Sequence, residues 1–166
     1  MIKYWASLIS LNLFVGALYA GASTYSYALV FPPEEYSVIW LAGGVGVASV
    51  VIFGRRVLAG IILGAIVSHT FNYLDISSVT TALASFTTIF ALVFSGIVQI
   101  EVSYRLIDRY VGLENPLIEL RDTLLFFFLA GPVGCLVGAF CGASIAIFIG
   151  LIPSERFLEY LWIWWQ

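Results

Sequence analysis

Residues 38–73 read VIWLAGGVGVASVVIFGRRVLAGIILGAIVSHTFNY, two apolar runs on either side of Gly54-Arg55-Arg56. Because an α-helix rises about 1.5 Å per residue, each run is about long enough to cross the hydrocarbon core of a bilayer. Paired arginines in such a short connection are expected on the cytoplasmic side. The stretch therefore predicts a tight membrane hairpin, whose outer end carries Trp40, His69 and Asn72.

The composition of the whole chain indicates an integral membrane protein. Of its 166 residues, 61% are hydrophobic and 10% are charged, whereas a soluble domain carries about 25% charged residues. Long uncharged runs, such as 4–33 and 123–154, are typical of transmembrane helices, since the strands of a barrel would alternate apolar and polar residues. A net charge of −3 leaves no basic patch for nucleic acid.

We predict an all-α, polytopic transmembrane helix bundle with about five full spans. The first apolar run superficially resembles a cleavable secretion signal, but it continues uncharged to Val30, which favours a retained first span. A fourth helix is expected to continue past the membrane as an amphipathic helix, and Gly131-Pro132 is expected to kink or break the fifth. The expected spans are 5–29, 37–53, 57–74, 79 to beyond 100, and 123–150.

The last segment, 155–166, is too short to span a bilayer, because a span needs about 20 residues. Its tryptophans form an interfacial belt, or the chain stops inside a sixth helix. We favour the second interpretation, in which a cytoplasmic output domain follows residue 166.

The basic residues orient the bundle. With the N-terminus in the cytoplasm, six of the seven basic residues fall on the cytoplasmic side and Arg156 alone falls outside. The six are Lys3, Arg55, Arg56, Arg105, Arg109 and Arg121.

A group of polar residues near the outer end of the hairpin is the candidate ligand pocket: Trp40, His69, Asn72, Glu34 and Glu35. His69 and Asn72 are three residues apart, so they share a helix face. Polar groups inside a bilayer need partners, so the group forms either an interhelical hydrogen-bond network or a ligand pocket. Proton sensing by His69, the only histidine, is a minor alternative.

Charged residues gather at the expected cytoplasmic rim: Glu101, Arg105, Arg109, Arg121 and Asp122. They are a solvated helix end with ion pairs of about 0.3–0.5 kcal/mol each, or a collar that couples the membrane domain to a cytoplasmic domain.

Glycines at four-residue spacing form two stripes that allow close helix packing: Gly60 and Gly64 in one, and Gly134, Gly138 and Gly142 in the other. Packing within the chain is the simpler interpretation, and a dimer seam is the alternative. Cys135 and Cys141 lack metal-ligand spacing and are expected to be small core residues. No nucleophile–base set, metal cluster or phosphate loop is visible, so we expect neither enzymatic activity nor a cofactor in these residues.

An ordered set of motifs runs along residues 38–166. The first half contains Trp40, Gly44, Gly54-Arg55-Arg56, Gly60, Gly64 and Asn72. The second half contains Glu101, Arg105-Leu106, Pro116-Leu117, Arg121-Asp122 and Trp162-x-Trp164-Trp165. This set resembles the bacterial membrane-associated sensor domain of the first MASE type. That family commonly has two prolines where this chain has Leu41-Ala42, and it is longer, so the chain corresponds to its N-terminal part.

The resemblance implies a multi-pass sensory domain of the bacterial inner membrane, placed before a diguanylate cyclase, phosphodiesterase or histidine kinase. It implies no particular ligand. The expected partners are membrane lipid, a second copy in a homodimer and a possible membrane partner protein. Two rival functions remain, a small transporter or substrate-binding membrane subunit, for which Gly131-Pro132 is the cue, and a scaffold that recruits a membrane partner.

Overall fold

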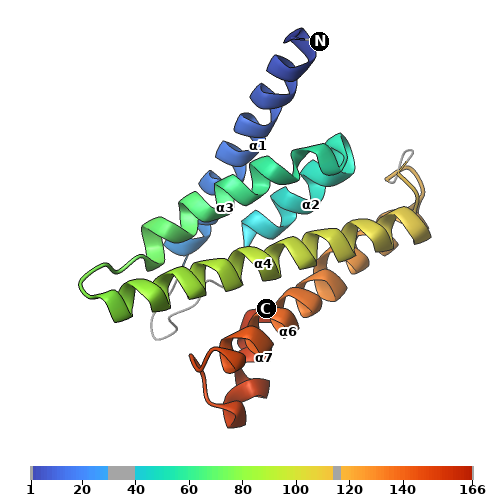
Figure 1. Cartoon of the computed structure of the whole chain (residues 1–166). Helices are drawn as coiled ribbons and strands as arrows, with labels where there is room; N and C mark the ends of the chain where they lie inside the picture. The colour runs from blue at the N-terminus through green and yellow to red at the C-terminus, as the bar shows by residue number, and fades with distance from the viewer. Residues whose placement is uncertain (1, 30–39, 114–116, 166) are drawn as a thin grey trace. The chain divides into compact units, whose positions relative to one another are not determined.

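The computed structural model describes residues 2–29, 40–113 and 117–165, and the regular structure in these ranges is entirely helical (Figure 1). The predicted all-α class is therefore confirmed for the described part of the chain. Two compact units divide the molecule, unit 1 at Met1–Phe94 and unit 2 at Ser95–Gln166, and the boundary between them falls inside one long helix.

Unit 1 contains the hairpin quoted above. Gly54 ends its first helix with φ of 74°, a left-handed conformation that glycine adopts without steric cost, and so allows the sharp turn before Arg55. The predicted Gly-Arg-Arg turn is confirmed. The elements of unit 1 are α1 (Ile2–Ala28), α2 (Leu41–Phe53), the 3-10 turn η1 (Arg55–Val57), α3 (Leu58–Tyr73) and the first half of α4 (Val79–Tyr110).

Helices α1 and α3 lie side by side and run in the same direction (Figure 1). Glycines remove the side chains that would separate them: a Cβ on Gly16 would lie 2.7 Å from the Gly60 carbonyl oxygen, and a Cβ on Gly64 would collide with the Gly16 backbone. Buried Val15 and Ile61 complete this apolar contact. Close backbone approach through small residues is the packing mode that membrane helices favour.

Side chains cap the start of α4. Ser78 Oγ accepts the backbone N–H of Thr81 at 3.1 Å, and Thr81 Oγ1 accepts the N–H of Ser78 at 3.0 Å. Two donors of the first turn are thereby satisfied. In the preceding loop the Asp75 carboxylate accepts the N–H of Ser77 at 2.8 Å, which holds the pKa of that carboxyl below its usual range.

Unit 2 begins with the second half of α4, which continues without a break to Tyr110 as predicted. Gly112, with φ of 88°, donates its N–H to the Ile107 carbonyl and closes the helix. Pro116, a residue type that suits the first turn of a helix, lies outside the described residues. The remaining elements are α5 (Leu120–Phe128), the π-helical turn η2 (Leu129–Val133), α6 (Gly134–Phe148), the 3-10 turn η3 (Ser154–Arg156) and α7 (Phe157–Trp165).

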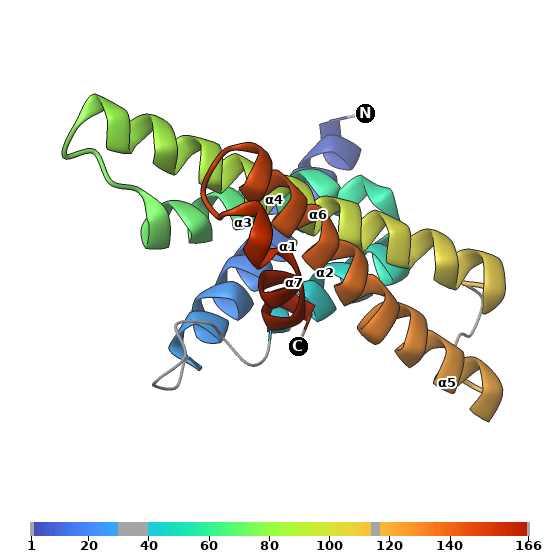
Figure 2. The same ribbon diagram turned by 90° about the horizontal axis from the view of Figure 1, so that it is seen from below.

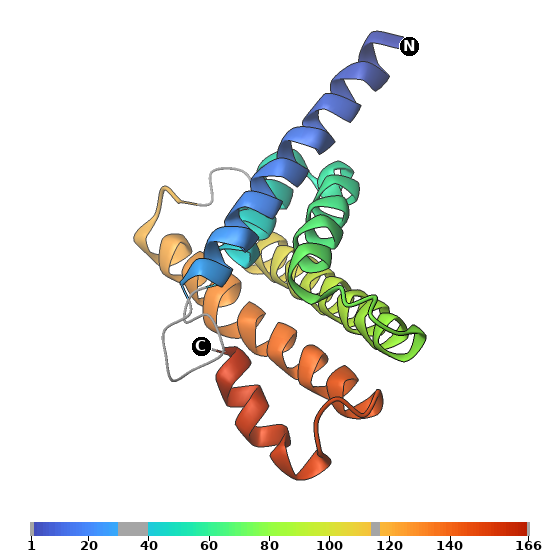
Figure 3. The same cartoon turned by 90° about the vertical axis from the view of Figure 1, so that its left-hand side faces the viewer.

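Helix α7 folds back along α6 (Figures 2 and 3). The contact is tight, since a Cβ on Gly142 would lie 3.0 Å from the Trp164 ring. Phe140 and Phe157 add an edge-to-face pair whose ring centroids are 5.7 Å apart. Trp164 therefore packs on α6 within unit 2.

Within the described residues, three helices are long and apolar enough to cross a membrane: Tyr4–Ala28, Val79–Tyr110 and Leu120–Phe148. The expectation of five full spans is not supported. Helix α2 has 13 residues and α3 has 16, or about 20 and 24 Å, and a hydrocarbon core is about 30 Å thick. The apolar run of α3 is longer than the helix itself, because Val57 and Leu74 in its connections are also apolar.

Candidate functional site

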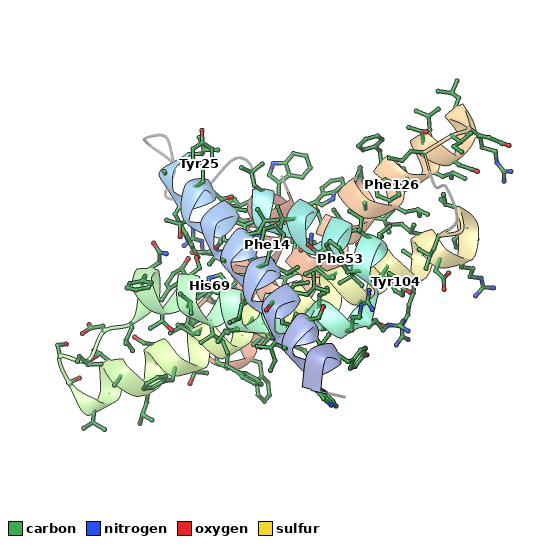
Figure 4. All side chains as sticks on the ribbon, turned by 90° about the horizontal axis from the view of Figure 1, so that it is seen from above. Phe14, Tyr25, Phe53, His69, Tyr104 and Phe126 are labelled. Carbon is green, nitrogen blue, oxygen red and sulfur yellow. The ribbon has the colours of Figure 1, made fainter. Side chains whose placement is uncertain are left out.

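Four ring-bearing side chains of unit 1 meet where α1, the start of α2 and the end of α3 come together. We call Tyr27, Trp40, His69 and Tyr73 the His69 cluster. His69 projects from α3 (Figure 4) and is 3% exposed, whereas Trp40 is 37% exposed. The cluster therefore combines a buried polar ring with aromatic rings that remain partly accessible.

The rings have defined mutual orientations. Trp40 lies nearly parallel to His69, at an interplanar angle of 7° with ring centroids 6.0 Å apart. Tyr27 stands edge-on to Trp40, at 84° and 5.3 Å, and Tyr73 lies 6.2 Å from His69. Edge-to-face and offset parallel arrangements are the favoured geometries of aromatic pairs.

The Tyr27 hydroxyl lies 2.9 Å from His69 Nδ1 and is its hydrogen-bond partner. With Nδ1 unprotonated the tyrosine donates, and with Nδ1 protonated the imidazole donates. The bond links α1 to α3, so a change in the protonation or contacts of His69 acts directly on the packing of these two helices.

A ladder of polar contacts between α1 and α3 positions the cluster. Asn12 accepts the Gly60 N–H at 2.8 Å near the start of α3, and Ser68, the residue directly before His69, donates its hydroxyl to Ser23 Oγ at 2.7 Å. Ser26 Oγ of α1 accepts the N–H of Leu41 at 2.9 Å. This bond holds the start of α2, and with it the preceding residue Trp40, against α1. The same side of α1 thus fixes both halves of the cluster.

The structure brings two of the five predicted pocket residues together. Trp40 and His69 stack, but Asn72 is exposed and its amide donates to the Ser68 carbonyl of its own helix at 2.8 Å. Glu34 and Glu35 lie outside the described residues.

Sequence reasoning missed Tyr27 and Tyr73. Tyr73 is four residues after His69, the spacing that places two side chains on one helix face, and this signal was available. Tyr27 could have been found from α1, where Asn12, Gly16 and Ser23 precede it at intervals of four or seven residues and mark one polar or small face.

The charged residues of the expected cytoplasmic rim make local contacts. Arg105 pairs with Glu101 one turn earlier at 2.7 Å, and the guanidinium of Arg109 lies 5.7 Å from the ring centroid of its neighbour Tyr110. Asp122 occupies the first turn of α5, where a carboxylate interacts favourably with the helix dipole. Arg121 lies on the same turn, at the edge of a shallow apolar groove with Leu120, Leu124, Leu125 and Phe128.

The second glycine stripe packs within unit 2. A Cβ on Gly134 would collide with the Ser103 hydroxyl, and one on Gly138 would collide with the Gln99 amide. Gln99 also donates to the Cys135 sulfur at 3.6 Å.

Cys135 and Cys141 are half-buried and form no disulfide. In the described ranges no three His, Cys, Asp or Glu side chains are grouped closely enough to hold a metal ion.

A search of curated proteins and a search of solved structures found no match. The family model of MASE1, by contrast, matches residues 9–166, nearly the whole chain, and the resemblance found in the sequence motifs is confirmed. MASE1 domains are membrane-associated sensory domains of signalling proteins and are not catalytic, so no enzymatic activity is expected in this region. The chain belongs to the MASE1 family of membrane-associated sensory domains.

Proposed function

We propose that this chain is the signal-input domain of a bacterial inner-membrane signalling protein and that it perceives its signal at the His69 cluster. A diguanylate cyclase, phosphodiesterase or histidine kinase in the cytoplasm is the proposed output. Family membership supports the sensory role, and the observation that carries the choice of site is the Tyr27–His69 hydrogen bond at 2.9 Å between α1 and α3.

Three properties of the cluster support perception there. Trp40 and Tyr73 are 37% and 41% exposed, so a ligand or a partner helix can reach aromatic rings that interact directly with His69. Aromatic faces with a hydroxyl and an imidazole offer both apolar contact and hydrogen bonding. Any ligand that displaces Trp40 also disturbs the packing of His69 against α1, which converts binding into helix movement.

The proposed relay passes from this movement to the cytoplasm through a homodimer. Helix α4 is the proposed carrier, because its 32 residues extend about 48 Å, longer than a hydrocarbon core of about 30 Å. Its last third contains Glu101, Arg105 and Arg109, and these charged residues are the proposed contact with the output domain.

Alanine substitution in the full-length protein tests the site. His69→Ala and Trp40→Ala are expected to abolish the response of the output, measured in cells as cyclic di-GMP level and as autophosphorylation. Asn72→Ala is the matched control, since Asn72 lies on the same helix but bonds to its own backbone. Normal responses in both cluster variants would refute the site, and a loss in Asn72→Ala of the same size would show a general effect on α3.

A small transporter or substrate-binding subunit is the rival function. Gly131-Pro132 suggested this function, because transporters often bind substrate at the unwound backbone of a discontinuous helix. Here the residues form a π-helical turn that continues directly into α6, so this cue is weak. Substrate uptake by proteoliposomes that contain the full chain would favour the rival.

A further inference from the structure

The π-helical turn η2 lies between α5 and α6 and surrounds Gly131-Pro132. Proline has no N–H, so in an α-helix Pro132 would leave the Phe128 carbonyl without its donor. In a π-helix each N–H pairs with the carbonyl five residues earlier, and Gly134 indeed donates to Leu129. By the same i→i−5 pattern the N–H of Val133 pairs with the Phe128 carbonyl. The wider turn therefore supplies a donor to the carbonyl that proline would leave without one.

The end of α7 is tied to this turn. The indole N–H of Trp165 donates to the Pro132 carbonyl at 2.8 Å, and the Trp165 ring packs edge-on against Trp162 with centroids 5.6 Å apart. Trp164, one residue earlier, lies against Gly142 of α6. A hydrogen bond thus connects the last described turn of the chain to the irregular point of the preceding helix.

The turn is also held against a polar group that has no partner. Ser103 of α4 is 0% exposed, and among the described residues its hydroxyl has no hydrogen-bond partner. It lies so close to Gly134, the residue after the turn, that no Cβ fits between them. A buried hydroxyl without a hydrogen-bond partner raises the free energy of the conformation that contains it. A rearrangement that moves Gly134 away from Ser103 opens space beside this hydroxyl and lowers that desolvation penalty.

We propose that η2 is a register switch and that Trp165 is its latch. Release of the Trp165–Pro132 bond allows the π-turn to convert to α-helical register, in which the Phe128 carbonyl loses its donor but the contact between Gly134 and the buried Ser103 hydroxyl is relieved. Because one residue of an α-helix corresponds to about 100° of rotation, the conversion turns α5 relative to α6 by about that angle and shifts it by about 1.5 Å. The idea that this movement relays a signal to the output rests on the sensory function proposed above. The existence of the switch is independent of that function.

Distances between spin labels in the full-length chain, reconstituted in lipid nanodiscs, test the switch. Labels at Leu124→Cys and Phe148→Cys occupy exposed positions on α5 and α6, with Cys135→Ser and Cys141→Ser as the background. Deletion of Ala130 removes the extra residue of the turn and supplies the reference distance for the α-register. The wild-type background supplies the distance for the π-register.

Trp165→Phe keeps an aromatic ring and removes the N–H that bonds to Pro132. It is expected to move a measurable fraction of molecules to the reference distance of the deletion variant. Trp162→Phe is the matched control, because it makes the same chemical change in a neighbouring ring and is expected to keep the wild-type distance. Addition of Ser103→Ala to Trp165→Phe is expected to return molecules to the wild-type distance, since the unpaired hydroxyl is then gone.

An unchanged distance in Trp165→Phe, or an equal shift in Trp162→Phe, would overturn the latch. If Trp165→Phe does not fold, Pro132→Ala carries the test, because it restores the missing amide and is expected to favour the α-register with Trp165 intact. An unshifted Pro132→Ala would then overturn the switch. The measurement uses no signal and no output, so it can fail while the response of the His69 cluster variants still supports the sensory function, and the reverse also holds.

Discussion

The hydrogen bond between Tyr27 and His69 is the smallest unit on which the proposed sensor depends. Hydrogen bonds between membrane helices contribute about 0.5–2 kcal/mol each. Tyr27→Phe removes the hydroxyl but keeps the ring contacts with Trp40 and Tyr73, so we expect a loss of that order in the free energy of unfolding. Unfolding in mixed detergent micelles with increasing dodecyl sulfate measures it.

Tyr25→Phe is the matched control for this prediction. Tyr25 lies on the same helix, is 59% exposed and projects away from α3 (Figure 4), so its hydroxyl is expected to contribute little. Equal losses in the two variants would mean that the effect comes from α1 as a whole and not from His69.

Asn12 makes a second specific prediction. Its amide donates to the carbonyl oxygens of Leu8 and Arg56, both at 3.0 Å, and its oxygen accepts the Gly60 N–H. Gly60 lies in the first turn of α3, where backbone donors have no partner within the helix. Asn12→Ala is therefore expected to destabilise the protein by about 1–3 kcal/mol in the same unfolding experiment.

Asn12→Asp separates the two halves of this contact. It keeps the acceptor for Gly60 and loses both donors, so an intermediate loss is expected. Ser10→Ala serves as the control, because Ser10 is exposed and bonds to the Ala6 carbonyl of its own helix. A loss in Ser10→Ala as large as that in Asn12→Ala would contradict the assignment.

At the residue scale the sequence predicted part of the site. His69 and Trp40 were identified because polar or large rings in apolar runs need an explanation. Tyr27 was missed because a tyrosine near a helix end equally fits an interfacial aromatic belt, and its partner is 42 residues away. Asn72 was expected to share the pocket with His69, whereas its amide donates to the Ser68 carbonyl of its own helix, an option that helical spacing does not reveal.

At the scale of elements, the contact between α1 and α3 depends on glycine. A Cβ on Gly64 would meet the Gly16 backbone, which cannot move aside as a flexible side chain can. Gly64→Ala is expected to separate the helices and to destabilise unit 1 by about 1–3 kcal/mol, in spite of the higher helix propensity of alanine. Thermal unfolding in detergent is the measurement.

Gly44→Ala and Gly21→Ala are the controls for the glycine contact, since nothing lies within 4 Å of a Cβ at either position. Both are expected to be neutral or to stabilise by up to about 1 kcal/mol, because alanine is the better helix former. Destabilisation of all three variants by the same amount would show that close packing is not the cause.

At this scale, local turns follow from the residue types more directly than helix lengths do. Gly54, Ser78 and Gly112 have chemistry that is specific for a turn or a cap, and each ends or begins a helix in the structure. The length of α3 was overestimated because the apolar residues Val57 and Leu74 lie in its connections, and the start expected for α2 at residue 37 lies outside the described residues. Gly131-Pro132 predicted a kink, but the π-register and its bond to Trp165 depend on a partner 33 residues away.

At the scale of the whole molecule, composition predicted an all-helical membrane protein, and the ordered motifs predicted its family. The number of spans could not be derived in the same way. Hydropathy counts apolar residues along the chain, whereas a span requires one continuous helix of sufficient length. Helices α2 and α3, at 13 and 16 residues, fall between a span and a buried core helix, and apolar composition fits both.

The orientation of the molecule is a prediction that α4 can test, because its 32 residues extend about 48 Å and its ends should reach both sides of the membrane. The distribution of basic residues places the Asp75 loop outside and the end of α4 in the cytoplasm. With Cys135→Ser and Cys141→Ser as background, Ser77→Cys is expected to react with a membrane-impermeant maleimide in spheroplasts, and Asp108→Cys only after permeabilisation. Both positions are exposed, so access and not burial decides the result. Reaction of both cysteines from the same side would mean that α4 lies along the membrane surface, and it would remove α4 as the carrier of the signal.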